Sequence, residues 1–216
     1  MADEYVYFTL KHIELLDRIV QLNYSTANNL VDRNIDARRA QGKLTNLKLS
    51  EFANISRIRY GARSCDGGTG LYGANLTAMV FVITKPDDFE MRSLIRNTWA
   101  SRFAMHNSTI RLMFAFGLPQ SDKKSSATSQ HQQQQSSSTI SAELQDQMIK
   151  EESTQFGDII QWEFEDGYYR LTIKSLAILR WASVYCTRVP VVFKIDADCM
   201  LNYDNLIRFS QSVTAN

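Results

Sequence analysis

The sequence has no apolar run long enough to cross a bilayer, and its charges show no excess of either sign. The apolar stretch Met79–Ile83 is far shorter than the roughly 20 residues that a membrane-spanning helix needs, and the first residues lack the apolar core of a signal peptide. The 24 basic and 23 acidic side chains nearly cancel, so no field of one sign would hold a nucleic-acid backbone. We therefore expect no nucleic-acid partner, and no membrane anchor among these 216 residues.

Cysteine is also scarce. The three cysteines are Cys65, Cys186 and Cys199, so at most one internal disulfide can form, and none of them has the spacing of a zinc site. Cys199 follows an expected buried strand and is explained as a small core residue. In an oxidising compartment our choice of pair is Cys65 with Cys186. Sequons of the Asn-x-Ser/Thr type, which carry glycans only in the secretory pathway, begin at Asn23, Asn54, Asn75 and Asn107.

From about Met79 onward, short apolar runs rich in β-branched and aromatic residues alternate with longer amphipathic runs. This alternation is typical of βαβ units and predicts an α/β fold with a mostly parallel central sheet. Strands are expected at Met79–Thr84, Ile110–Phe116, Asp158–Phe164 and Val191–Asp196, and helices at Asp87–Ala100 and Leu171–Tyr185.

The remaining residues are expected to form a stem before the folded domain and an insertion within it. Residues 1–75 are expected to be a stem or linker with one amphipathic helix, Tyr5–Leu22, followed by polar and charged sequence with little power to form a core. Residues 76–216 would then form the folded domain. Within it, residues 118–140 are rich in Ser and Gln, and we expect them to be a disordered insertion.

The most informative segment is Pro190–Asp198, an expected buried strand that delivers Asp196 and Asp198 at its carboxyl end. Ligands of open α/β sheets bind at that end of the strands. Two aspartates separated by one residue can hold a hard divalent cation and leave positions open for diphosphate oxygens. The D-x-D pattern also occurs by accident in surface loops, and the apolar strand before it favours the metal hypothesis.

Five segments, in this order, resemble the motifs of one enzyme family. They are Met91–Trp99, Phe114–Gly117, Glu151 or Glu152 with Phe156–Gln161, Phe164–Lys174, and Phe193–Asp198 with Asn202 and Leu206. Over roughly Met79 to Phe209 the chain is therefore similar to glycosyltransferase family 31, the β-1,3-galactosyl- and β-1,3-N-acetylglucosaminyltransferases.

The resemblance implies a GT-A-like nucleotide-sugar-binding fold, here truncated after the D-x-D motif, and a hexosyltransferase of the Golgi membrane. UDP-galactose or UDP-N-acetylglucosamine would be the donor, a glycan the acceptor and manganese the metal. Asp196 and Asp198 would hold the metal. The donor would be bound by Arg92, Arg96, Asp166, Lys174 and Asp196.

Two departures bear on this interpretation. Ala197 replaces the middle Asp of the family's D-D-D, and Arg170 replaces an Asn. A β linkage made from an α-linked donor requires inversion and hence a general base, which we expect beyond the chain end, so no catalytic residue is assigned. The alternatives are an incomplete transferase that acts only as a UDP- and metal-binding or interaction module, and a D-x-D phosphatase, which Met200 in place of the required Thr or Val disfavours.

Overall fold

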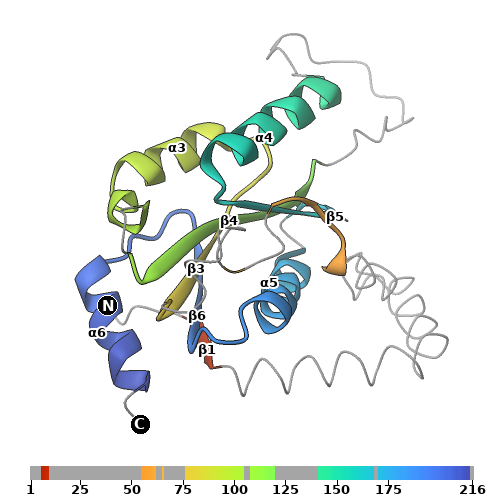
Figure 1. The fold of residues 1–216 in the computed structure, drawn as a ribbon. Coiled ribbons are helices and arrows are strands. Elements are labelled where there is room, and N and C mark those ends of the chain that lie inside the picture. Colours follow the sequence, from red (N-terminus) through yellow and green to blue (C-terminus); the bar gives the residue numbers. More distant parts are fainter. Residues whose placement is uncertain are drawn as a thin grey trace, which may run out of the picture.

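A computed structural model describes residues 6–9, 55–61, 65, 76–104, 108–119, 141–167 and 170–214. Their centre is a six-stranded sheet in the order β1-β6-β3-β4-β5-β2 (Figure 1). The four inner strands run parallel to one another, and the two edge strands pair antiparallel with their neighbours. The predicted α/β fold with a mostly parallel sheet is confirmed.

The four inner strands are the ones expected from the sequence. They are β3 (Ala78–Ile83), β4 (Ile110–Leu118), β5 (Ile159–Glu165) and β6 (Val191–Asp196). All of β3 is buried, because helices cover both faces of a parallel sheet and leave its central strands no contact with water. Leu118, which the sequence prediction gave to the insertion, instead ends β4. Residues 120–140 of that insertion lie outside the described residues.

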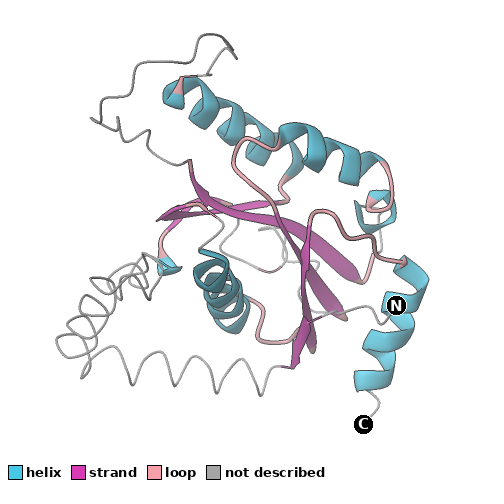
Figure 2. Ribbon diagram, turned by 180° about the vertical axis from the view of Figure 1, so that it is seen from behind, coloured by secondary structure: helices cyan, strands magenta, loops and turns pink. Residues whose placement is uncertain are grey.

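Helices cover both faces of the sheet. The described α-helices are α3 (Phe89–Asn97), α4 (Ala142–Phe156), α5 (Leu171–Tyr185) and α6 (Tyr203–Thr214). Figures 1 and 2 show α3 and α4 over one face and α5 over the other. Ile95 of α3 and Ile149 of α4 share a core cluster with Val80 and Val82. Trp181 of α5 belongs to the cluster on the opposite face.

The sequence predicted two of these helices. Helix α5 has the expected bounds, whereas α3 begins only after Asp88, and residues 98–100 form a turn before the short helix η2 (Ser101–Ala104). Helix α4 was not predicted. It is capped by Ser141, whose hydroxyl accepts a hydrogen bond from the Leu144 N–H, and it ends at Gly157, which has a φ of 63°. Ser before a helix and Gly after it are common end signals.

The prediction of a helix at Tyr5–Leu22 is wrong for Val6–Thr9, which form strand β1; residues 10–22 lie outside the described residues. The run V-Y-F-T is made of β-branched and aromatic residues that suit a strand. Pairing with β6 also satisfies backbone groups of β6 that would otherwise lie at an open edge. Strand β2 (Ile58–Tyr60) comes from the same expected stem, so parts of residues 1–75 extend the sheet.

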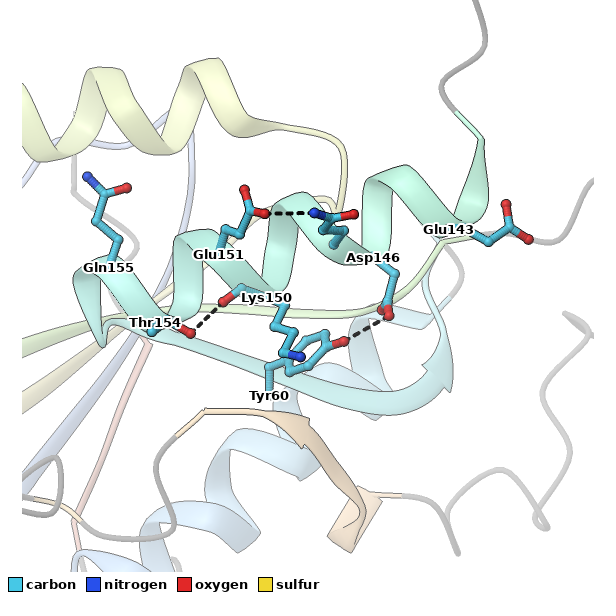
Figure 3. A pocket seen from close by; sticks show the side chains of 8 residues that line it. Tyr60, Glu143, Asp146, Lys150, Glu151, Thr154 and Gln155 are labelled. Carbon is cyan, nitrogen blue, oxygen red and sulfur yellow. Dashed lines mark hydrogen bonds between the residues drawn. The ribbon is translucent and has the colours of Figure 1, made fainter.

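Strand β2 is attached to α4 by polar side chains. Both carboxylate oxygens of Asp146 accept hydrogen bonds from Arg59, at 2.8 Å each, and Tyr60 donates its hydroxyl to Asp146 at 2.8 Å (Figure 3). These contacts lower the pKa of Asp146, chiefly through the hydrogen bond from Arg59. Burial and the hydrogen bond to Asp146 raise the pKa of Tyr60. The edge strand is thus fixed to a helix that covers the sheet.

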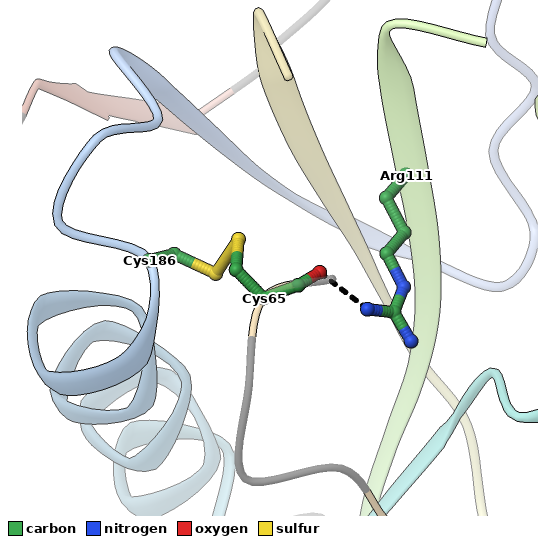
Figure 4. Close-up of a disulfide and its surroundings, with 3 residues drawn as sticks. All are labelled: Cys65, Arg111 and Cys186. Carbon is green, nitrogen blue, oxygen red and sulfur yellow. Dashed lines mark hydrogen bonds between the residues drawn. A yellow bond between two sulfur atoms is a disulfide. The ribbon is translucent and has the colours of Figure 1, made fainter. Parts of the chain in front are cut away.

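A disulfide joins Cys65 to Cys186 (Figure 4), as the sequence analysis chose, and leaves Cys199 as the free cysteine. Cys186 directly follows α5. The bond therefore ties the segment before β3 to the connection between α5 and β6. Arg111 donates to the Cys65 carbonyl at the same place. Within the described ranges, no helix has the length and apolar character needed to cross a membrane.

Candidate functional site

The carboxyl ends of the four parallel strands meet at one edge of the sheet. Ile83, at the end of β3, is opposite Asp196 of β6 on one side and Ala115 of β4 on the other. Asp166 directly follows β5, and its N–H donates to the carbonyl of Leu118 at the end of β4 at 2.7 Å. This edge is the usual ligand-binding edge of an open α/β sheet.

Asp196 and Asp198 lie in a turn at this edge. Asp196 is the last residue of β6, and its carbonyl accepts a hydrogen bond from the Cys199 N–H at 3.1 Å, which closes the turn. Both aspartates are exposed, and Asp196 has 61% of its side-chain surface in contact with solvent. The Lys194 ammonium lies 3.9 Å from a carboxylate oxygen of Asp196. The Cys199 thiol donates to Asp198 at 3.7 Å, and both carboxylates remain accessible to a ligand from solvent.

The chemistry of this turn fits a cation that shares its coordination with a phosphate ligand. Among the described residues, no group of three or more His, Cys, Asp or Glu side chains could hold a metal by itself. Small hard cations, however, are often bound by one or two carboxylates, with the remaining positions filled by water and by phosphate oxygens. Asp196 and Asp198 could supply such carboxylates, because Ala197 removes only the middle one of the three in the D-D-D motif of the family that the sequence resembles.

Asp166 and Lys174 form a buried ion pair behind the strand ends. The Lys174 ammonium lies 2.7 Å from Asp166 Oδ1 and donates to the carbonyl of Thr84 at 3.2 Å. Asp166 Oδ2 accepts the Gly117 N–H at 2.8 Å. The pair comes from the start of α5 and the end of β5, so it connects the ends of β3, β4 and β5. The sequence placed both residues near the donor and did not predict that they bond to each other.

Arg92 and Arg96 lie between α3 and α4 and share one carboxylate. Each donates to Glu152 at 2.7 Å, and Arg96 also binds both oxygens of Asp158 at 2.7 and 2.8 Å. Arg92 is fully buried, and its other hydrogen bonds reach the carbonyls of Lys85 and Pro86. Burial lowers the pKa of Arg96, but the hydrogen bonds that it donates to Asp158 and Glu152 outweigh this effect and raise the pKa above its ordinary value.

The structure also decides between the two glutamates that the sequence left open. Glu152 is the buried partner of both arginines, whereas Glu151 is exposed and accepts a hydrogen bond from Gln147. Asp158 and Glu152 were not predicted as partners of Arg92 and Arg96. These contacts join residues that are 56 to 62 positions apart in the sequence. Only the order of the five family-like motifs indicated that these segments belong to one site.

Two further polar groups are buried near this edge. Thr84 follows β3, and Gln161 lies in β5, where its side-chain amide donates to the Gly117 carbonyl at 3.0 Å. The Thr84 hydroxyl and the Gln161 amide oxygen have no hydrogen-bond partner among the described residues. Sequence reasoning singled out neither of them as a separate site residue.

A surface cavity lies on the other side of the molecule from the aspartate turn. It is lined by Tyr60 of β2 and by the exposed face of α4 (Figure 3). Three strands, β3, β4 and β5, separate β2 from β6 in the sheet. The cavity is thus not part of the site at Asp196 and Asp198.

Comparison with known proteins identifies the same segment. Residues 138–215 match the family model described as galactosyltransferase. The chain is 30% identical over 142 residues to human UDP-GlcNAc:betaGal beta-1,3-N-acetylglucosaminyltransferase 9. These residues make up 66% of this chain and 34% of that protein. It is 33% identical over 129 residues to human Beta-1,3-galactosyltransferase 2, over 60% of this chain and 26% of the relative.

A third relative, human Lactosylceramide 1,3-N-acetyl-beta-D-glucosaminyltransferase, is 29% identical over 138 residues, which make up 62% of this chain and 32% of that protein. The chain thus spans between a quarter and about a third of the length of these relatives. The family match covers α4, β5, α5, β6 and α6, including the aspartate turn. The predicted resemblance is confirmed over this segment: residues 138–215 match the galactosyltransferase family model, and the relatives are β-1,3-N-acetylglucosaminyl- and β-1,3-galactosyltransferases.

Proposed function

We propose that this chain is the donor-binding part of a hexosyltransferase that transfers galactose or N-acetylglucosamine from a UDP-sugar to a glycan acceptor. The product would be a β-1,3 linkage, formed with inversion. The observation that carries the proposal is the exposed turn Asp196–Asp198 at the carboxyl edge of the parallel sheet, inside the segment that matches the family. The names of the relatives support the donor and the linkage.

Asp196 and Asp198 would hold a divalent cation, with manganese as our choice from the family resemblance. When bound, such a cation neutralises charge on a leaving nucleoside diphosphate. The protein residues would bind the cation and the donor and orient them. The two carboxylates would hold the cation at the end of β6, and the segment after β3 would form the neighbouring wall, because Ile83 and Asp196 are paired in the sheet. Inversion also requires a base that deprotonates the acceptor hydroxyl, and we assign that role to no residue of this chain.

We further propose that the protein works in the Golgi as a membrane-attached enzyme with a lumenal catalytic domain. The Cys65–Cys186 disulfide supports an oxidising compartment, and the four sequons support passage through the secretory pathway. Expression of the full-length protein in animal cells tests this. We expect a glycosidase that removes N-glycans to increase its gel mobility; an unchanged mobility together with a cytosolic location would contradict the proposal.

Calorimetric titration of the protein with UDP, in the presence and absence of manganese, tests the proposed site. We expect binding that depends on manganese and that is lost in the variants Asp196→Asn and Asp198→Asn, which keep the side-chain shape and remove the charge. Asp204→Asn is the matched control, because Asp204 has a similar exposure of 58% but lies on α6 and pairs with Arg102. Equal binding by all three variants would refute the metal assignment.

A further inference from the structure

Buried cations hold three successive backbone carbonyls directly after β3. The carbonyl of Thr84 accepts a hydrogen bond from Lys174 at 3.2 Å. The carbonyls of Lys85 and Pro86 accept from the two terminal nitrogens of Arg92, at 2.6 and 3.2 Å. The segment between β3 and α3 is thus fixed by side chains at three consecutive peptide groups.

The two cations approach this segment from opposite faces of the sheet. Lys174 lies on α5, and Arg92 lies on α3 (Figures 1 and 2). Each has its own buried counter-ion: Lys174 pairs with Asp166 and Arg92 with Glu152, both at 2.7 Å. Arg92 is also close to two aromatic rings, with its guanidinium carbon 4.7 Å from the centre of Phe89 and 4.8 Å from that of Phe116.

Removal of these charges from water is unfavourable unless close partners compensate. The partners found here are one carboxylate and at least one backbone carbonyl for each cation. Arg92 has 0% of its side chain exposed, and Lys174 has 4%. These side chains are therefore committed to the protein, and what they offer to a ligand is the position of the backbone that they hold.

We propose that Arg92, Glu152, Lys174 and Asp166 form a clamp, here called the edge clamp, that positions residues 84–88 beside the aspartate turn. Ile83, the residue before this segment, is paired with Asp196, so a shift of the segment alters the wall of the donor site. The four are positioning residues: they act through the backbone and do not touch the donor. The inference rests on the proposed function for its binding readout, and it reassigns Arg92, Asp166 and Lys174 from direct donor contact.

The two interpretations predict opposite effects of neutralising the acidic members. If Arg92 or Lys174 contacted the diphosphate directly, loss of a neighbouring negative charge would leave the affinity for the anionic ligand unchanged or increase it. In the edge clamp, Glu152→Gln or Asp166→Asn removes the counter-ion that holds a cation in place. The carbonyls of residues 84–86 are then no longer fixed, and the affinity falls.

The test is calorimetric titration with UDP and manganese at a temperature well below unfolding, for Glu152→Gln and Asp166→Asn, with Asp204→Asn as the control outside the clamp. We expect each clamp variant to bind UDP about tenfold more weakly, the range usual for residues that orient ligand-binding groups, and the control to bind as the parent does. Parental or tighter binding by both folded clamp variants would overturn the inference.

Amide hydrogen exchange separates positioning from a loss of overall stability. The Asp88 N–H donates to the Lys85 carbonyl at 3.2 Å inside the clamped segment, and the Leu206 N–H donates to the Asn202 carbonyl at 3.0 Å at the start of α6, outside the clamp. We expect faster exchange at Asp88 in both clamp variants and unchanged exchange at Leu206. Equal acceleration at the two sites would mean that the ion pairs only stabilise the fold, and would overturn the clamp.

The exchange measurement needs no ligand, so it also separates this inference from the proposed function. If the parent protein binds no UDP with manganese, the proposed function fails, while Asp88 exchange still decides whether the clamp holds residues 84–88. Should Glu152→Gln not fold, Asp166→Asn on the opposite face provides the same comparison.

Discussion

The carbonyl oxygen of Phe164 lies so close to Gly117 that a Cβ atom added at residue 117 would come within 2.4 Å of it. The contact is to backbone, which cannot rotate away as a side chain can. Gly117 also donates its N–H to Asp166, so a shift of β4 here would disturb the end of β5. The close approach of β4 and β5 at this position therefore requires glycine.

We predict that Gly117→Ala lowers the free energy of unfolding by about 3 kcal/mol, the upper part of the range for overpacked interiors. Urea denaturation followed by circular dichroism would measure it. The control is Gly157→Ala, where an added Cβ has no atom within 4 Å but the φ is +63°, so only backbone strain of about 1 kcal/mol is expected. A cost no larger at Gly117 than at Gly157 would contradict the close contact.

The Asp146 contacts predict a pH-dependent link between β2 and α4. Hydrogen bonds from Arg59 and Tyr60 hold the pKa of Asp146 below its ordinary value of 3.8. A carboxyl group whose pKa is lowered in the folded state stabilises the fold above its unfolded pKa, and this contribution is lost as the pH falls through the folded pKa. The contribution should be present in full near pH 7 and begin to decline as the pH falls below about 4.

Asp146→Asn measures that contribution. Because the pair is partly exposed to solvent, we expect a loss of about 1 kcal/mol at pH 7, which shrinks toward zero when both proteins are unfolded by urea near pH 3. A difference that stays constant between pH 7 and pH 3 would show that the charge of Asp146 is not its source.

The ion pair between Arg96 and Asp158 should contribute more than the exposed pair between Arg102 and Asp204, which also has two hydrogen bonds. Arg96 has 13% of its side chain exposed and Asp158 20%, whereas Arg102 and Asp204 have 48% and 58%. We predict that Arg96→Ala costs about 2–3 kcal/mol of unfolding free energy, because it leaves Asp158 without its arginine partner and removes one of the two arginines bound to Glu152.

A double-mutant cycle between Arg96→Ala and Asp158→Ala gives the coupling free energy of this pair. The same cycle with Arg102→Ala and Asp204→Ala is the control, because that pair also has two hydrogen bonds but is far more exposed to water. Comparable coupling in the two cycles would mean that the position between α3 and α4 adds nothing to the interaction.

The sequence predicted the inner sheet well because buried parallel strands form continuous apolar runs, as in β3 and β6. It missed α4 because that helix buries only Ile149 and Glu152, so its apolar pattern is weak. It assigned Val6–Thr9 to a helix because pairing with β6, nearly 190 residues away, is decided by tertiary structure rather than by local propensity.

The candidate site divides in the same way. Asp196 and Asp198 could be predicted because the apolar strand and the two carboxylates are adjacent in the sequence. The burial of Arg92 could not, since it depends on Glu152, which is 60 residues away, and on the carbonyls of the segment after β3. An arginine in such a motif suggests direct contact with the donor diphosphate, whereas the proposed edge clamp gives Arg92 a positioning role.

The Cys65–Cys186 disulfide closes a loop of 121 residues in sequence, and loops of that length restrict the unfolded chain strongly. We predict that the double variant Cys65→Ala, Cys186→Ala loses about 3–5 kcal/mol of unfolding free energy.

Thiol titration of the parent, unfolded without reductant, should find one thiol, that of Cys199, and three after reduction. In the folded protein Cys199 should react slowly with alkylating agents, because burial, followed by the charges of Asp198 and Asp196, raises its pKa and lowers the fraction of thiolate. Three reactive thiols in the unreduced chain would rule out the disulfide.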